Sequence, residues 1–265
     1  MRDFLEFPPF DEDLDRISAD PVAKARALNR RELPKRFYTE AAVRPATAGF
    51  AIELDRRPVK TPAKRALVVP RQDLAEAIAG EWQAQGERID PATMPYTRLA
   101  NSIIDGVAER ADEVVADLAG YAGSDLLCYR AASPVRLAER QTTVWDPILD
   151  WADERLGARF TVVEGVIHVA QDPEAIEAVR RRVAELDAFT LGGLHSVTTL
   201  TGSVIIALSL LDGHLDTDAA WRAGSLEDHW SLEVWGYDAD ASDRLERRRS
   251  DFLAAAAFLA GGRAG

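Results

Sequence analysis

Cysteine is almost missing from this chain of 265 residues, because Cys128 is the single one. One cysteine forms no intramolecular disulfide, and a zinc ribbon or a redox-active pair needs at least two. This usage fits a reducing compartment. Because Cys128 follows two leucines and precedes Tyr129, we expect it to be a small buried apolar residue and not a reactive thiol.

The sequence also lacks the motifs of the common hydrolases and nucleotide-binding enzymes. None of the four histidines, His168, His195, His214 and His229, stands four residues from another, and the HExxH, GxSxG and GxxxxGK patterns are all absent. The small residues from Gly192 to Ser203 resemble a phosphate-binding turn, but close helix packing explains them better. We therefore expect no catalytic residue, no metal and no cofactor, and we predict that the protein is not an enzyme.

No apolar run is long enough to cross a membrane. The most apolar segment, residues 197–211, is 15 residues long and carries five hydroxyl side chains, whereas a span needs roughly 20 residues. It is expected to be a buried helix, so direct membrane insertion is not predicted. The first residues show neither the basic and apolar regions of a signal peptide nor a basic transit peptide. These features predict a cytoplasmic protein of a bacterium.

Positive charge is in deficit. The formal net charge is −12 and the isoelectric point is about 4.9, so the long-range field of the protein repels phosphate groups. The arginine runs at 180–182 and 247–249 lie on predicted helices that also carry acids, which is typical of solvated helix faces. We expect no nucleic-acid partner. A basic or apolar protein partner is compatible with this charge, and so is a simple role in solubility.

The periodicity of the apolar residues predicts an α+β protein, with a small N-terminal antiparallel β region followed by a larger, mainly α-helical region. Phe50, Ile52 and Leu54 alternate with other residues as in a strand. From Arg71 onward the spacing becomes helical. We divide the chain into an N-terminal arm (1–33), an antiparallel β region with the first helix (34–85), and a helical domain (86–265).

Helix-end signals predict where the helices lie. A short helix is expected over 21–30 in the arm, and residues 96–119 are expected to be helical with a break at Gly106. Asp146-Pro147 and Asp172-Pro173 each place an N-cap acceptor before a proline, which predicts two helix starts. Ser225 to Asp228 resembles a capping box. The later helices are expected over 194–211, 217–222, 225–234 and 242–259.

Several sequence blocks occur in a fixed order over residues 34 to 260. They are Lys35-Arg36-Phe37-Tyr38, Leu54 to Pro62, Val69-Pro70, Glu81-Trp82, Leu126 to Arg130, Trp145 to Ala152, Leu226-Glu227 and Trp235-Gly236. Together they resemble the assembly chaperones that hold the alpha subunit of the catalytic sector of F-type ATP synthase. The sequence departs from the mitochondrial members after Gly236, where Ala239 and Ser242 replace an acid and a histidine and only Asp243 is retained.

The resemblance implies a function without catalysis. Chaperones of this family bind the unassembled alpha subunit until the beta subunit takes their place, so the implied partner is that alpha subunit, bound by a chaperone that is a monomer when free. Two other readings stay open. A small-molecule enzyme would use a cleft between the β and helical regions, with Asp125, Arg130 and His195 as its polar groups, and a scaffold protein would hold a different client.

The tryptophans suggest where a client would bind. Trp82, Trp145 and Trp151 fall on apolar helix faces and are expected in the core. Trp221, Trp230 and Trp235 lie among acids, a composition common in partner-binding surfaces, although covering the core of the last helices explains them equally well. The predicted client-binding residues are Glu227, Trp230, Trp235, Asp238, Asp240 and Asp243.

Overall fold

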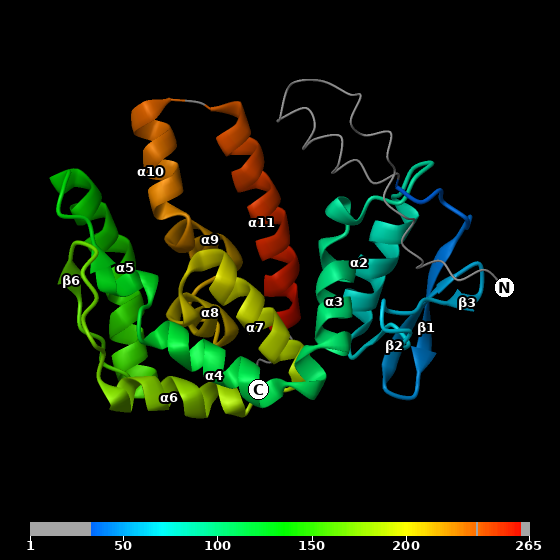
Figure 1. Cartoon of the computed structure of the whole chain (residues 1–265), viewed down its shortest axis with the longest axis horizontal. Coiled ribbons are helices and arrows are strands. Elements are labelled where there is room, and N and C mark those ends of the chain that lie inside the picture. The colour runs from blue at the N-terminus through cyan, green and yellow to red at the C-terminus, as the bar shows by residue number, and fades with distance from the viewer. Residues whose placement is uncertain (1–32, 237, 261–265) are drawn as a thin grey trace, which may run out of the picture.

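The computed structural model describes residues 33–236 and 238–260, and it places a small sheet at one end of an elongated helical body (Figure 1). The helix expected over 21–30 and all but the last residue of the proposed arm lie outside the described residues. The β elements are β1 (Ala41–Ala46), β2 (Gly49–Leu54), β3 (Arg57–Pro58), β4 (Val68–Val69), β5 (Tyr129–Arg130) and β6 (Val163–Glu164). The α-helices are α2 (Gln72–Gln83), α3 (Pro95–Asp105), α4 (Ala111–Ala122), α5 (Val135–Leu156), α6 (Pro173–Ala184), α7 (Ala188–Thr201), α8 (Val204–Leu211), α9 (Thr217–Gly224), α10 (Leu226–Trp235) and α11 (Ala239–Leu259). Within the described ranges, three short 3₁₀ helices span Pro91–Thr93, Val107–Glu109 and Leu126–Cys128.

The N-terminal sheet is antiparallel, as the alternating pattern predicts, and the α+β class is confirmed. β1 pairs with β2 from Ala41 opposite Leu54 to Ala46 opposite Gly49, while β3 and β4 also pair with β2. Gly49 is required here, because its φ is +134° and a Cβ atom would lie 2.2 Å from the carbonyl oxygen of Val69. The sheet packs its apolar face on α2.

Two carboxylates fasten the sheet and α2 to α3. Glu81 of α2 accepts hydrogen bonds from the backbone N–H groups of Tyr96 and Thr97, at 2.7 and 2.8 Å, and so caps the start of α3. Burial raises the pKa of Glu81, while these hydrogen bonds oppose the rise. At the other end of α3, Asp105 accepts from the Thr61 hydroxyl at 2.6 Å. Thr61 and Glu81, which belong to the ordered sequence blocks, therefore have structural roles.

The helical body is built around α7 and α8, which lie at its centre (Figure 1). Asp187 caps α7 by accepting from the N–H groups of Phe189 and Thr190. A Cβ atom on Gly192 would lie 2.4 Å from Ile103, and one on Gly193 would lie 2.7 Å from Phe258. The small residues therefore let α3 and α11 approach α7 closely, which confirms the packing interpretation of this glycine-rich segment.

The single helix predicted over 194–211 is wrong, because the structure has two helices there. Gly202 ends α7 in the left-handed conformation, with φ +75°, and the Ser203 hydroxyl accepts from the N–H of Ile206 to start α8. The apolar spacing runs through both helices, so it conceals the break. The break expected at Gly106 is confirmed, since α3 ends at Asp105.

The helix start predicted at Asp146 is also wrong. α5 begins at Val135 and continues through Pro147, which is exposed and lies inside the helix. A proline here leaves the carbonyl of residue 143 without its helical partner, but residue 143 is exposed to solvent, so the cost of the missing bond is smaller than in a buried helix. Trp145 and Ile148 are buried on either side and hold the helix together.

Of the other two helix-start predictions, one is confirmed and one is wrong. Asp172 does cap α6, with its carboxylate 2.8 Å from the N–H of Glu174. The capping box at Ser225 does not form, because the serine hydroxyl donates to the carbonyl of Trp221 at 2.6 Å. In the described part of the chain, no helix is long and apolar enough to cross a membrane.

Candidate functional site

The last two helices, α10 and α11, form a hairpin that projects from the helical body (Figure 1). Gly236 follows α10 with a φ of +87°, which turns the chain. Asp238 starts α11, because its Oδ1 accepts from the N–H of Ala241 at 3.0 Å. The turn therefore places the end of α10 and the start of α11 together, at the tip of the hairpin.

The tip exposes a large aromatic side chain beside a cavity. Trp235 is 85% exposed and Val234 is 52% exposed. A cavity of about 460 Å³ lies between the helices. Its lining comprises Asp228, Ser231, Leu232, Trp235, Gly236, Asp238, Ala241, Arg244, Leu245 and Arg248. An exposed indole next to an apolar hollow with charged edges is a composition suited to anchoring a partner protein.

Helix α10 is also tied to α5 along one side. Trp230 is half-buried, with the guanidinium of Arg140 5.2 Å from its ring. Arg140 donates to Glu233 at 2.9 Å, and this bond lowers the pKa of the Glu233 carboxyl. Glu227 accepts from the amide of the buried Gln141 at 2.7 Å.

The six predicted client-binding residues thus fall into two groups. Trp235 and Asp238 line the cavity at the tip, and Asp240 and Asp243 are exposed on the first turns of α11. The remaining two, Glu227 and Trp230, have partners on α5. Among the other tryptophans, Trp145, Trp151 and Trp221 are buried, so Trp221 is a core residue. Trp82 is partly buried against the sheet. Client binding by the six residues stays a prediction.

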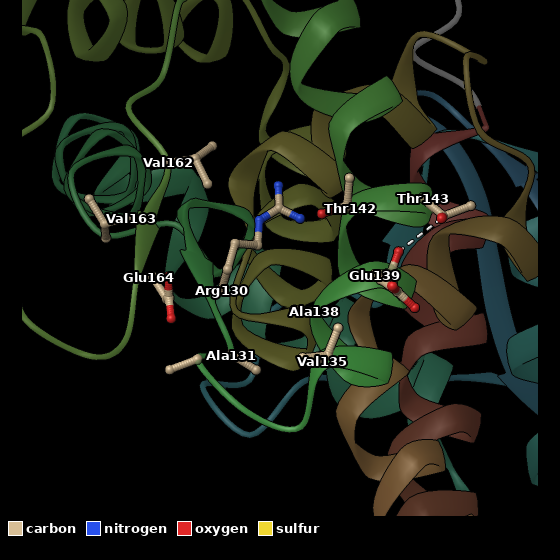
Figure 2. Close-up of a pocket in the computed structure, with 11 residues that line it drawn as sticks. Arg130, Ala131, Val135, Ala138, Glu139, Thr142, Thr143, Val162, Val163 and Glu164 are labelled. Atoms are coloured by element: carbon tan, nitrogen blue, oxygen red, sulfur yellow. Dashed lines mark hydrogen bonds between the residues drawn. The ribbon is translucent and has the colours of Figure 1, made fainter.

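A second surface, which we call the α5–β6 groove, lies at the opposite end of the molecule from the sheet (Figure 1). Strand β6 pairs in parallel with β5, so that Val163 lies opposite Tyr129. A cavity of about 660 Å³ opens between this strand pair and the first turns of α5 (Figure 2). It is lined by Arg130, Ala131, Ala132, Val135, Ala138, Glu139, Thr142, Thr143, Val162, Val163 and Glu164.

The floor of the groove holds a buried cation. The guanidinium of Arg130 lies between Val162 and Thr142 (Figure 2) and is only 8% exposed. It donates to Asp146 at 2.8 Å and stacks 5.1 Å from the ring centre of Trp145. Burial lowers the pKa of Arg130, and the neighbouring Asp146 carboxylate opposes this. The cation is held in place by these two partners.

Exposed apolar side chains belong to this groove and to the loop that follows β6. Among the described residues, nine large apolar side chains are exposed, and five of them line the groove or belong to this loop. They are Val135, Val162, Val166, Ile167 and Val169. The loop that carries the last three is closed at its base by two hydrogen bonds between the Gln171 amide and the backbone of Thr161.

The valine- and isoleucine-rich composition of residues 160–170 predicts an extended segment, and part of it is strand β6. It does not show which face is exposed, because a strand at the surface and one in the core have the same composition. Sequence reasoning therefore missed this surface.

The polar groups named for a small-molecule enzyme do not converge on one site. Asp125 is wholly buried, where its carboxylate accepts from the N–H groups of Leu127 and Ile205. His195 faces Asp117, at 2.9 Å, and Arg130 is bound to Asp146. Burial raises the pKa of the Cys128 thiol to about 12, which makes it a poor nucleophile. Within the described ranges, no cluster of three metal-ligating side chains is present.

Comparison with known proteins gives a consistent result. Residues 35–153 match the model of the family described as ATP12 chaperone protein. The chain is 24% identical over 237 residues to mitochondrial protein atp12 of Schizosaccharomyces pombe, covering 85% of this chain and 81% of that protein.

Solved structures agree with this match. The crystal structure of Atp12 from Paracoccus denitrificans is 40% identical, with a TM-score of 0.77, covering 87% of this chain and 99% of that one. A crystal structure of a candidate chaperone from Agrobacterium tumefaciens is 42% identical, with a TM-score of 0.81, covering 94% of each chain. Sequence and fold therefore match over most of the length of these proteins.

Proposed function

The chain belongs to the ATP12 chaperone family, and from this premise we propose that it is an assembly chaperone of ATP synthase. It binds the unassembled alpha subunit of the catalytic sector and protects that subunit's interface until the beta subunit displaces it. We further propose that it acts without catalysis, in the cytoplasm of a bacterium. The resemblance of the sequence blocks supports the choice of the alpha subunit as client.

The physical need for such a protein is direct. Half of an obligate interface is apolar and has no partner before assembly, so the free subunit aggregates through it. A chaperone that covers this surface stabilises the subunit by mass action. It must also leave when the true partner arrives, so its contact has to be smaller or weaker than the final interface. Displacement of this kind requires no chemical step.

The observation that carries the proposal is the exposed indole at the tip of the hairpin. Trp235 is 85% exposed, beside a cavity and three carboxylates. Such a side chain is costly to leave in water, and in an interface it buries a large apolar area. We assign the client contact to Trp235 and to the carboxylates of Asp238, Asp240 and Asp243, with Glu227 and Trp230 holding α10 against α5.

Aggregation of the isolated alpha subunit tests this function. The denatured subunit is diluted into buffer with or without the chain, and light scattering is followed. Near-stoichiometric chain is expected to suppress scattering equally with ATP, with a non-hydrolysable analogue and without nucleotide. The Trp235→Ala variant is expected to suppress it less, while Phe37→Ala, which removes an exposed aromatic group at the sheet end of the molecule, serves as the matched control. A requirement for hydrolysable ATP would exclude this mechanism.

A further inference from the structure

We propose that the α5–β6 groove is a second docking site, which takes an extended, apolar segment of the client that also carries basic side chains. This inference rests on the proposed function for the identity of the client. The chemistry of the site depends on the side chains of the groove alone. The groove lies on the side of α5 that bears Val135 and Glu139, and α10 packs on the same helix through Arg140 and Gln141.

Large apolar side chains of the groove and of the loop that follows β6 are exposed to solvent. Val166 and Ile167 are 94% and 80% exposed, and Val135 is 67% exposed. Soluble proteins rarely leave several large apolar side chains together in water unless they serve an interface. The cavity of about 660 Å³ beside them provides depth for side chains of a bound segment. An apolar occupant is therefore favoured.

The charges around the groove determine which apolar segment fits. A second cavity of about 510 Å³ adjoins the first and shares Arg130, Thr142 and Val162 with it. Both cations of the two cavities have an ion-pair partner, Arg130 in Asp146 and Arg159 in Asp153, while Nε and Nη1 of Arg130 are buried without a hydrogen-bond partner among the described residues. Three lining carboxylates, of Glu139, Asp150 and Glu164, have no ion-pair partner among the residues that the structure describes. These unpaired acids favour lysine or arginine on the bound segment and disfavour acids.

The loop that would contact the segment has few backbone restraints of its own. Strand β6 pairs with β5 near the start of this loop. Beyond β6, the loop is tied to the rest of the chain by the N–H of Gly165, which donates to the carbonyl of Arg130 at 2.8 Å, and by a contact of 3.2 Å between His168 and the Tyr129 hydroxyl. A loop held at these points can adjust to different side chains. An extended segment, whose own backbone is free, suits such a loop better than a rigid helix does.

The experiment compares short capped peptides by fluorescence anisotropy. One peptide alternates valine with lysine, a second alternates valine with glutamate, and a third alternates serine with lysine. Binding is measured to the full chain, to a loop variant with Val166→Ser and Ile167→Ser, which removes apolar surface without adding charge, and to a control variant with Phe37→Ser. Because all three substituted side chains are highly exposed, thermal melts of the variants are expected to match that of the parent.

The full chain and the Phe37→Ser variant are expected to bind the valine–lysine peptide at least roughly tenfold more tightly than the other two peptides, and the loop variant is expected to lose this affinity. Equal binding of the three peptides, or an unaffected loop variant, would overturn the proposal. Sedimentation measurements on the parent chain and the loop variant test whether a second copy of the chain occupies the groove. A dimer that the loop substitutions dissociate would also overturn the proposal. The peptide assay does not contain the alpha subunit. Failure of the chain to bind the alpha subunit would therefore reject the proposed function without deciding whether the groove binds the peptide.

Discussion

At the scale of single residues, Asp125 is the most constrained ionisable group of the described chain. Its carboxylate is wholly buried and accepts from the N–H of Leu127 at 3.0 Å and the N–H of Ile205 at 3.2 Å. It thereby joins the segment before β5 to the start of α8. Burial raises its pKa to about 6, while hydrogen bonds from Ser203 and the backbone oppose the rise. The cost of burying the charge therefore exceeds the gain from these donors.

This raised pKa predicts a pH dependence of stability. Between about pH 4 and 6 the folded chain keeps the proton of Asp125, whereas the unfolded chain, with its ordinary pKa, has lost it. Stability from this group is therefore fully present below about pH 4 and declines as the pH rises through 6. The free energy of unfolding of the parent, relative to Asp125→Asn, should fall by roughly 1–3 kcal/mol from pH 4 to pH 7 in urea titrations. A difference that is constant with pH would contradict the assignment.

Local sequence signals predict much of the fold, but the same signal has different outcomes at different positions in the chain. Asp146-Pro147 and Asp172-Pro173 have the same local meaning, yet only the second begins a helix. The first pair lies inside α5 because burial of Trp145 and Ile148 outweighs the cost of an internal proline, and because Asp146 binds Arg130. These partners lie outside the local pattern, so no reading of the pair alone predicts the outcome.

At the scale of elements, the hairpin of α10 and α11 combines a structural role with an exposed surface. One side of α10 is held by Arg140 and Gln141 of α5, while the end of the same helix exposes Trp235. Asp238 is also both structural and exposed, since its carboxylate caps α11 while the residue lines the cavity. A test of the charge at the tip therefore has to preserve this cap.

The prediction for the tip uses a variant with Asp238→Asn, Asp240→Lys and Asp243→Lys. Asparagine removes the charge of Asp238 and still caps a helix. Affinity for the alpha subunit should fall, and the weakening of binding by salt should shrink, because fewer charges remain to be screened. Calorimetric titration at two salt concentrations measures both effects, and a thermal melt checks the fold.

The matched control reverses two exposed acids in the first turn of another helix, with Asp112→Lys and Glu113→Lys in α4. Both variants alter charge near a helix N-terminus, so any general effect of charge or helix stability appears in both. If both variants bind as the parent does, or both weaken equally, the acids at the tip are an ordinary solvated surface and the client contact lies elsewhere.

The sequence predicts the helices of the candidate site, but it does not predict which of the nearby tryptophans is exposed. The sequence pattern predicts that helices cover 225–234 and 242–259 and that tryptophans and acids lie there, and the structure has α10 and α11 in those places. It does not distinguish Trp221 from Trp235, although one is 4% and the other 85% exposed. Both have acids nearby in the chain, and it is the packing of α9 beside α11, with Trp221 against Phe252, that buries the first.

At the scale of the whole molecule, the candidate surfaces lie away from the sheet (Figure 1). The apolar cluster beneath the sheet extends through α2 and α3 to Phe258 of α11, so the hairpin helix is rooted in the core shared with the sheet. Many of the ordered sequence blocks serve this packing. The tip of the hairpin and the α5–β6 groove remain as the places where large apolar side chains gather in water.

Displacement by the beta subunit tests the proposed function most directly. The chain is labelled with a fluorophore, bound to the isolated alpha subunit, and followed by anisotropy as the beta subunit is added without nucleotide. The chain should be released in step with formation of the alpha–beta complex, and unlabelled chain in excess should slow that release by rebinding. A chain that never binds the alpha subunit, or that stays bound while the beta subunit joins, would contradict its role as an assembly chaperone that holds the interface until the partner arrives.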